Sequence, residues 1–220
     1  MKAVVFDFDG TLTEENFKLW KKIWKELGYE IGENSYYESL VKSFMSGKIT
    51  HKQWCELTLK AFQERGFTEQ KLDEITKGIV LIDGVEDLFK YLKTKGVELH
   101  IVSGNIVSVI KKVLRQNVGY ITAIKANEFL FDKQGKLVEI VGTKYDYEGK
   151  ATYIKELCKK MGCKPQEILF VGNSINDEWV CKSGVKTICV NPDEANIRDS
   201  YVWNKVIYTN NLMDLKEELK

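Results

Sequence analysis

The alternation of short apolar runs with helical patterns most limits what this chain can fold into. Five runs have the length and apolar character of buried strands: 3–6, 97–103, 168–172, 187–190 and 205–208. Segments with helical period lie among them at 83–96, 106–116 and 151–162. In 83–96 the apolar stripe is Val85, Leu88 and Leu92, and Gly96 ends the pattern. This alternation predicts an α/β fold, with a Rossmann-like parallel sheet covered by helices.

Residues 14–77 interrupt the alternation with helical patterns and no convincing strand. Trp20 and Trp24 are one helical turn apart in this block, a spacing that more often reflects packing than ligand binding. We predict a small all-helical cap domain at 14–77, inserted after the first strand, and a core domain formed by 1–13 and 78–220. The cap is expected over the carboxyl edge of the sheet, where open α/β sheets bind ligands. Residues 128–142 alternate around a DKQG turn and predict a β-hairpin.

Composition narrows the class of protein. In 220 residues, 44% are hydrophobic and 30% charged, which predicts a soluble chain with a substantial core. A formal net charge of +1 argues against a surface that binds nucleic acid by bulk electrostatics. No run is long enough to span a membrane, and a strand from Ala3 leaves no room for a signal peptide. The five cysteines show no CxxC pairing, and this pattern predicts reduced thiols in the cytoplasm.

Two aspartates, Asp7 and Asp9, end the first strand with one residue between them. On a strand this spacing places both carboxylates on one face, where they repel unless a cation or a shared proton intervenes. One interpretation is an ordinary turn, with Gly10 supplying a permissive backbone. The other is a magnesium-dependent carboxylate site.

Further polar residues follow other predicted strands or begin a helix. They are Ser103 and Gly104 after 97–103, Lys150 at a helix start, and Asn173, Asn176 and Asp177 after 168–172. Each of these signals is weak alone. Because loops that follow adjacent parallel strands converge at one edge of a sheet, together they predict a site around one phosphate group.

These stretches resemble the four ordered motifs of the haloacid dehalogenase superfamily. The matching segments are DFDGTLT, VSGN, the lysine of EGKA, and GNSINDEW. The helical insertion, GKITHKQW within it, ANEFLFDKQGKL and VNPDEA resemble the branch that contains the phosphoserine phosphatases. The resemblance covers essentially the whole chain and implies the fold of that superfamily and a Mg²⁺ cofactor.

The resemblance also implies a role for each motif residue. Asp7 would attack phosphorus and form an aspartyl-phosphate, and Asp9 would act as general acid and then as general base. Lys150, together with magnesium, would neutralise the phosphate. The substrate-binding set would be Phe8, Gly10, Ser103, Gly104, Lys150 and Asn176, and the metal set Asp7, Asp9, Asn173 and Asp177. Asp177 would support the metal through water or orient Lys150.

The second aspartate, Asp9, narrows the reaction classes that the resemblance allows. Dehalogenases of this superfamily lack a counterpart of Asp9, since their chemistry needs no acid for a leaving alkoxide. We therefore expect a magnesium-dependent phosphatase that acts on a small phosphomonoester. The alternatives are a phosphoserine phosphatase with rearranged substrate anchors, a phosphotransferase, and a phosphate-binding or regulatory protein with weakened catalysis.

Two features depart from the phosphoserine phosphatase pattern. The fourth motif of that branch has an aspartate where this chain has Asn173, whose amide can ligate a hard cation but adds no negative charge. The glutamate expected nine residues after the nucleophile is Asn16. The arginine expected in the cap also has no match, because Arg65 lies beside Gly66 at a helix end. Both charged anchors for a serine leaving group are therefore absent from their usual positions.

Overall fold

The computed structural model describes residues 1–14, 17–192 and 203–219, and its centre is one sheet of seven strands in the order β4-β3-β2-β1-β5-β6-β7. The strands are β1 (Ala3–Phe6), β2 (Glu98–Ile106), β3 (Ala123–Phe131), β4 (Leu137–Val141), β5 (Ile168–Gly172), β6 (Lys186–Val190) and β7 (Lys205–Ile207). All neighbouring strands are parallel except β3 and β4. At the centre of the sheet, Phe6 pairs with Ile101 of β2 and Val171 of β5.

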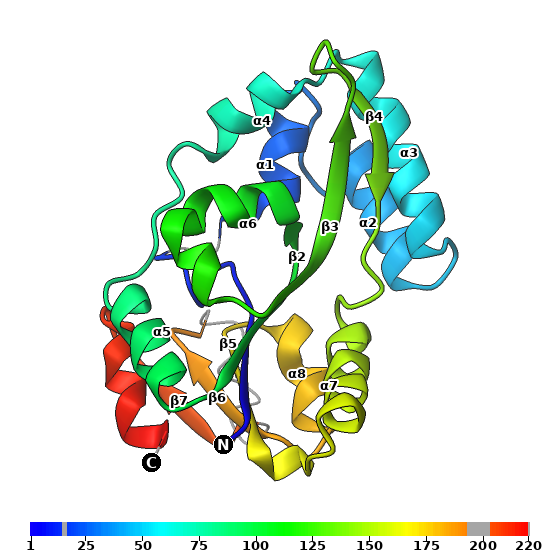
Figure 1. Cartoon of the computed structure of the whole chain (residues 1–220). Helices are drawn as coiled ribbons and strands as arrows, with labels where there is room; N and C mark the ends of the chain where they lie inside the picture. The colour runs from blue at the N-terminus through cyan, green and yellow to red at the C-terminus, as the bar shows by residue number, and fades with distance from the viewer. Residues whose placement is uncertain (15–16, 193–202, 220) are drawn as a thin grey trace.

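Helices cover both faces of this sheet, as the sequence predicts (Figure 1). The core helices are α5 (Val85–Thr94), α6 (Val107–Leu114), α7 (Glu148–Met161) and α8 (Glu178–Cys181). Short 3₁₀ helices are η1 (Arg115–Tyr120), η2 (Pro165–Glu167), η3 (Ile175–Asp177) and η5 (Leu212–Leu219). Alternate residues of β1 serve opposite faces: Val4 and Phe6 pack with α5, α6 and η5, and Ala3 and Val5 pack with α7 and α8. The predicted α/β fold is confirmed.

Four helices between β1 and α5 form the all-helical cap. They are α1 (Leu19–Glu26), α2 (Tyr36–Met45), α3 (His51–Glu64) and α4 (Glu69–Thr76). Local sequence sets their starts, since Ser35, Thr50 and Thr68 each accept a hydrogen bond from a backbone N–H in the first turn. A buried cluster around Trp24 and Phe62 continues from the cap into α6, β3 and β4. All four helices lie within 14–77, the range predicted for the cap, and the exact domain limits stay a prediction.

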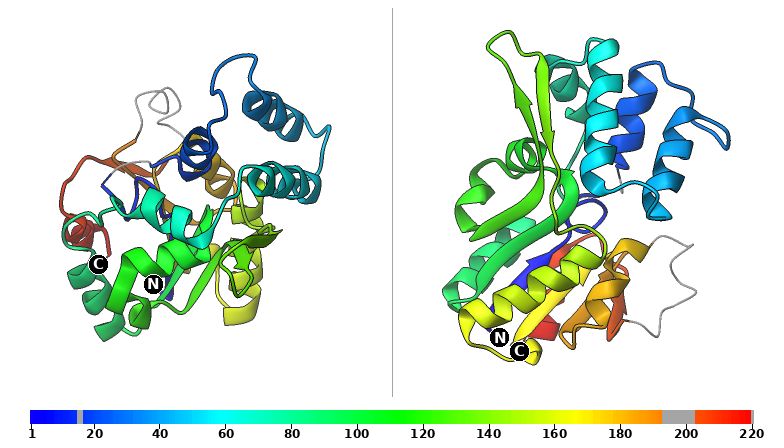
Figure 2. Two further views of the ribbon diagram at one scale, coloured as in Figure 1. Left: turned by 90° about the horizontal axis from the view of Figure 1, so that it is seen from above. Right: turned by 90° about the vertical axis from the view of Figure 1, so that its right-hand side faces the viewer.

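The predicted hairpin is present, but it belongs to the main sheet. β3 begins at Ala123 and pairs in parallel with β2, and only its distal part pairs with β4 around the turn. Asp132 accepts the backbone N–H groups of Gln134 and Lys136 at 2.9 Å, and Gly135 has φ 73°. The hairpin rises beside the cap, where α3 lies along β4 (Figures 1 and 2). The cap thus packs against an arm of the core sheet.

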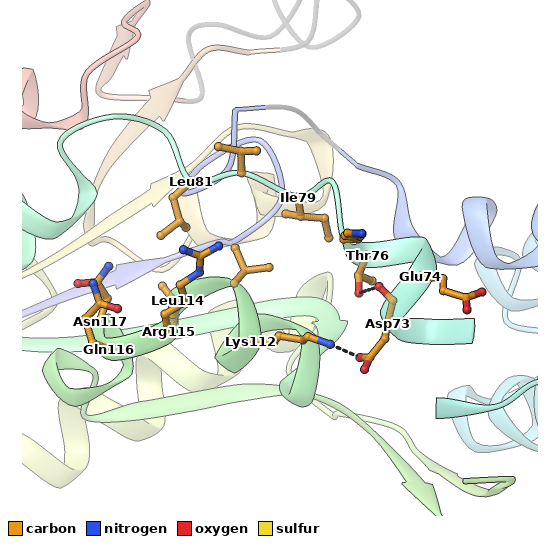
Figure 3. A pocket seen from close by; sticks show the side chains of 13 residues that line it. Asp73, Glu74, Thr76, Ile79, Leu81, Lys112, Leu114, Arg115, Gln116 and Asn117 are labelled. Carbon is orange, nitrogen blue, oxygen red and sulfur yellow. Dashed lines mark hydrogen bonds and ion pairs between the residues drawn. The ribbon is translucent and has the colours of Figure 1, made fainter. Parts of the chain in front are cut away.

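Two chain segments connect the cap to the core, and they run side by side. Glu14 N donates to Val80 O at 3.1 Å, and Ile82 N donates to Leu12 O at 3.0 Å. A hollow of about 710 Å³ lies next to them, between α4 and the end of α6 (Figure 3). Lys112 and Asp73 form an ion pair of 2.5 Å across it. None of the predicted site residues lines this hollow. No helix in the described residues is long and apolar enough to cross a membrane.

Candidate active site

The carboxyl edge of the central strands gathers the predicted residues. Asp7 follows β1, Ser103 lies in β2, and Asn173 follows β5. The Asp7 N–H donates to Val171 O at 2.8 Å, so the β1–β5 ladder extends to the first aspartate. Because the strands are parallel and in register, motifs more than 90 residues apart meet at one edge.

Lys150 lies at the centre of the site and is fully buried. Its Nζ is 3.1 Å from Asp7 Oδ1 and 2.6 Å from Asp177 Oδ1. Burial alone lowers the pKa of Lys150, but the neighbouring carboxylates, Asp177 first, outweigh it and raise the pKa. The ammonium is therefore a fixed positive charge next to Asp7.

Both carboxylate oxygens of Asp177 accept hydrogen bonds within this arrangement. Its Oδ1 accepts from Lys150, and its Oδ2 accepts the N–H groups of Asn173 and Ser174, both at 3.1 Å. A Cβ at Gly172 would lie 2.5 Å from the same Oδ2, so glycine permits this close approach. With both oxygens engaged, Asp177 is placed to orient Lys150 and the loop after β5.

Asp9 is held by hydrogen bonds from Asn105, which is not among the site residues predicted from the sequence. Asn105 Nδ2 donates to both Asp9 oxygens at 2.9 Å. Burial raises the pKa of Asp9 to about 6, and the Asn105 hydrogen bonds and Lys150 oppose the rise. Burial likewise raises the pKa of Asp7 to about 7 against the effect of Lys150. A carboxyl group with a pKa near 6 exchanges its proton readily at neutral pH, as a general acid and base must.

Three polar side chains fix the segment from Ser103 to Asn105, which lies within β2 and not after it as the sequence predicts. Ser103 Oγ accepts the N–H of Asn105 at 3.2 Å. Asn127 Nδ2, on β3, donates to Gly104 O at 2.7 Å, and Trp20 Nε1, on cap helix α1, donates to the same oxygen at 2.8 Å. The Gly104 carbonyl therefore ties the core sheet and the cap to the predicted phosphate loop.

The remaining predicted residues lie beside these groups. The Phe8 side chain is buried in the core cluster, so only its backbone is available to a substrate. Gly10 has φ 69°, and its N–H donates to Thr13 Oγ1 at 2.9 Å, so it shapes the turn after Asp9. Asn176 lines the pocket, and its Oδ1 accepts from the Ser174 hydroxyl.

The site has an oxygen-rich place for a hard cation. Asn173 Oδ1 is buried and has no hydrogen-bond partner in the described part of the chain. Three carboxylates, those of Asp7, Asp9 and Asp177, lie near the buried ammonium of Lys150. In residues 1–14, 17–192 and 203–219, no group of three or more His, Cys, Asp or Glu side chains is placed to hold a metal ion. A cation here would use a mixed set of carboxylate, amide and backbone oxygens, which suits Mg²⁺.

Comparison with known proteins agrees with this geometry. A family model for haloacid dehalogenase-like hydrolases matches residues 1–183. The chain belongs to this family. A phosphoserine phosphatase of Archaeoglobus fulgidus is 28% identical over 219 residues, which is 100% of this chain but only 60% of that protein. One of Methanocaldococcus jannaschii is 26% identical over 194 residues and covers 87% of both chains. The predicted kinship with the phosphoserine phosphatase branch is confirmed.

Solved structures show the same fold. A phosphoserine phosphatase in its apo form superposes with a TM-score of 0.73 at 20% identity and covers 100% of this chain and 99% of that one. A substrate-bound phosphoserine phosphatase gives 0.72 at 21% identity, with 100% and 98% coverage. These matches place the hydrolase core and its cap in one known architecture.

A pocket of about 240 Å³ is lined by Asp7 and Asp9, and several of its other lining residues are not predicted from the sequence. The unexpected lining residues are Lys18, Leu19, Trp20, Lys21, Tyr37, Asp146, Tyr147 and Ser174. The cap contributes five of these, and no short motif marks them. Trp24 is fully buried in the cap, as its helical spacing predicts, while Trp20 both packs and reaches the phosphate loop. The sequence does hint at a role for Asn105, since this residue is the last of the VSGN motif.

Proposed function

We propose that this hydrolase is a magnesium-dependent phosphatase that acts on a small phosphomonoester through an aspartyl-phosphate. The observation that carries the proposal is the position of Lys150 Nζ, 3.1 Å from Asp7 Oδ1, with Asp9 held separately by Asn105. Asp7 thus has the Lys150 ammonium as its counter-ion, while Asp9 is held by a neutral amide; burial raises the pKa of both carboxyl groups. This division suits a nucleophile beside a general acid.

Asp7 is the proposed nucleophile. One of its carboxylate oxygens attacks phosphorus, the P–O bond to the alcohol breaks, and the phosphoryl group becomes an acyl phosphate on Asp7. Lys150 reduces the repulsion between the anionic nucleophile and the phosphate. The Ser103 hydroxyl and the backbone amides of Phe8, Asp9 and Gly104 are the proposed donors to phosphate oxygens.

Asp9 moves the proton in both halves of the reaction. Protonated Asp9 gives its proton to the departing alkoxide, and the resulting carboxylate then takes a proton from the water that attacks the acyl phosphate. Asn105 holds both Asp9 oxygens, so the group keeps its orientation between the two steps. The second step returns Asp7 and Asp9 to their initial states and releases inorganic phosphate.

Asp7, the Asp9 backbone and Asn173 Oδ1 are the proposed holders of Mg²⁺. When bound, the ion neutralises negative charge on the phosphate and on the nucleophile. With Mg²⁺ bound, Asp7, whose pKa burial raises, would stay ionised as the nucleophile. Asp177, whose oxygens are occupied by Lys150 and two backbone amides, supports this set from outside.

The size of the pocket supports a small phosphorylated metabolite as the substrate. A phosphoserine phosphatase with rearranged anchors remains a candidate, because Asn16 lies outside the described residues. The guanidinium of Arg65 lies 4.8 Å from the centre of the Tyr29 ring and does not line the pocket. The substrate panel should include phosphoserine, sugar phosphates and nucleoside monophosphates. The cytoplasmic location and the lack of a nucleic-acid partner stay predictions from composition.

The test is phosphate release from para-nitrophenyl phosphate with magnesium, by the wild-type protein and by Asp7→Asn. An amide cannot form the acyl phosphate, so we expect turnover to fall by more than about 1000-fold, as for loss of other catalytic nucleophiles. Asp87→Asn makes the same chemical change on exposed helix α5 and should keep full activity. Robust turnover by Asp7→Asn would refute the covalent route, and an inactive wild-type protein would favour the phosphate-binding alternative.

A further inference from the structure

The hollow between the cap and the core has the size of a site for a small molecule. Its volume of about 710 Å³ lies within the range of about 300–1,000 Å³ that is usual for such sites. One wall is helix α4 with the linker that follows it, and the other is the end of α6 with η1 (Figure 3). The hollow shares no lining residue with the pocket at Asp7 and Asp9. A molecule bound here would therefore contact the cap and the core without entering the candidate active site.

Part of this hollow is lined by aliphatic side chains. Ile79, Val80 and Leu81 line it from the linker, and Val113 and Leu114 line it from α6. Val80 is 53% exposed, so solvent reaches this apolar lining. An exposed aliphatic cluster gains free energy when an apolar molecule covers it.

The charged residues around the apolar lining leave positive charge unmatched. The cations are Lys77, Lys112 and Arg115, and the acids are Asp73 and Glu74. Lys112 and Asp73 form an ion pair with each other, whereas Lys77 and Arg115 form none in the described part of the chain. The planar guanidinium of an arginine binds a carboxylate through two hydrogen bonds. An unpaired arginine beside aliphatic side chains thus suits a ligand that combines a carboxylate with an apolar body.

The backbone of Arg115 also indicates a role for its side chain. This residue has φ 52° and ψ −127°, a conformation that favours glycine. A residue with a side chain adopts it only at a cost in folding free energy. Figure 3 shows the guanidinium extending from the end of α6 toward Leu81 on the opposite wall. Local folding therefore disfavours arginine here, and a ligand for the guanidinium would explain its presence.

A buried amide lies in the same wall, two residues further along the chain. Asn117 is 5% exposed and lines the hollow, and its Oδ1 has no hydrogen-bond partner in the described part of the chain. A buried acceptor without a donor is costly to the folded state. The wall around Arg115 thus has unused capacity for polar contacts as well as an unpaired charge.

We propose that this hollow is a binding site for a small organic acid that carries one carboxylate on an apolar body. Arg115 would bind the carboxylate, and the apolar part would cover Leu81 and Leu114. A monoanion fits better than a phosphate dianion, because Asp73 and Glu74 also line the hollow and repel negative charge. The site is separate from the proposed phosphatase activity and does not depend on it.

Isothermal titration calorimetry with 2-naphthoate and 2-naphthamide tests the site, because the two probes share their rings and differ in charge. We expect the wild-type protein to bind naphthoate more tightly than naphthamide by about tenfold or more, as hydrogen bonds between charged groups allow. Arg115→Gln should remove this preference and change the affinity for naphthamide by less than about twofold. Arg65→Gln alters another exposed arginine at a helix end and should keep the preference.

Arg115→Gly separates binding from folding. Glycine adopts a positive φ without strain, so this variant should melt no lower than the wild-type protein. It should nevertheless bind naphthoate no better than naphthamide. Lower melting temperatures for both Arg115→Gly and Arg115→Gln would show that the arginine has a structural role and would overturn the inference.

The remaining outcomes concern the probes and the location of the site. Equal affinity of the wild-type protein for the two probes, or no binding of either, refutes the proposed site. A preference that Arg115→Gln retains refutes it as well. Lys21→Gln changes a residue that lines the pocket at Asp7 and Asp9, and the preference should survive this change. Its loss would place naphthoate in that pocket and overturn the inference, while phosphate release by the wild-type protein tests the phosphatase separately.

Discussion

At the scale of single residues, the charge balance of the site is uneven, because several carboxylates lie around the one ammonium of Lys150. Lys150 is bonded to two aspartates in a fully buried position, and Asn105 supplies neutral hydrogen bonds to a third. Neutral donors hold Asp9 in place without lowering its pKa as far as a second ammonium would. Asn173 continues this pattern, because it offers an oxygen but no charge.

Asn173→Asp is expected to strengthen magnesium binding. The buried Asn173 Oδ1 has no partner among the described residues, and an aspartate would add a negative charge at that position. We expect the magnesium concentration for half-maximal activity to fall by about tenfold or more, ~1.4 kcal/mol of binding free energy. Magnesium titrations at saturating substrate measure it, with exposed Asn34→Asp as the control. An unchanged midpoint would show that residue 173 does not contact the metal.

At the scale of elements, polar side chains join the strands, the helices and the cap. Asn127 on β3 donates to the loop of β2, and its Oδ1 accepts Thr143 N at 2.8 Å. Trp20 joins α1 to that loop and packs edge-on against Trp54 and Phe129. One short segment after Ser103 thus receives side-chain hydrogen bonds from β3 and from cap helix α1.

Trp20→Phe separates the hydrogen bond of this residue from its packing. Phenylalanine keeps an aromatic ring beside Trp54 but cannot donate to Gly104 O. A lost neutral hydrogen bond is worth about 0.5–1.5 kcal/mol, so we expect kcat/KM to fall by roughly two- to tenfold. Steady-state kinetics measure the loss, and a melting temperature confirms that the cap remains folded. Unchanged kinetics would mean that the indole N–H does not position the phosphate loop.

His100 predicts a pH-dependent contribution to stability at the junction of β2 and α7. Its Nδ1 is 2.8 Å from the Tyr153 hydroxyl, and its Nε2 is 3.1 Å from Glu98 Oε2. Burial lowers the pKa of His100, although Glu98 opposes the effect. The folded state therefore binds fewer protons than the unfolded state, and the free energy of unfolding should decrease as the pH falls below about 6.5.

The measurement is urea unfolding of wild type and His100→Gln between pH 7.5 and 5.5. Glutamine cannot titrate in this range, so the variant should lose less stability on acidification. Both proteins keep the aspartates of the active site, so their contribution cancels in the difference between the two curves. Parallel curves would contradict the expected role of His100.

At the scale of the whole molecule, the cap and the core contribute different residues to the pocket. The core lines the pocket with Asp7, Asp9 and Ser103, and the cap lines it with Trp20, Lys21 and Tyr37. The two linkers are hydrogen-bonded near Glu14 and Val80, and the Lys112–Asp73 pair bridges the hollow beside them (Figure 3). Both side chains of that pair are about half exposed, so the pair adds little stability.

Substrate choice is therefore expected to respond to changes in the cap. Lys21→Ala should alter the ratio of kcat/KM values between charged phosphomonoesters by about threefold or more, as an exposed ion pair allows. Its effect on para-nitrophenyl phosphate should be smaller, because that ester has no second charged group. Lys25→Ala lies on the same helix away from the pocket and is the control. Equal scaling of all substrates would show that the cap is not the selector.

The sequence by itself determined the strands, most helices, the helical insertion and the residues around Lys150. These follow from local patterns: strands and helices have different periods, and motifs at the ends of parallel strands meet at one edge. Only the tertiary structure decided that β3 joins the main sheet, that Asn105 grips Asp9, and that Asp146 faces Gly104. Such contacts join segments that are far apart in the sequence, as Asn105 with Asp9 and Asp146 with Gly104. They depend on how those segments pack in three dimensions, which no short stretch of sequence encodes.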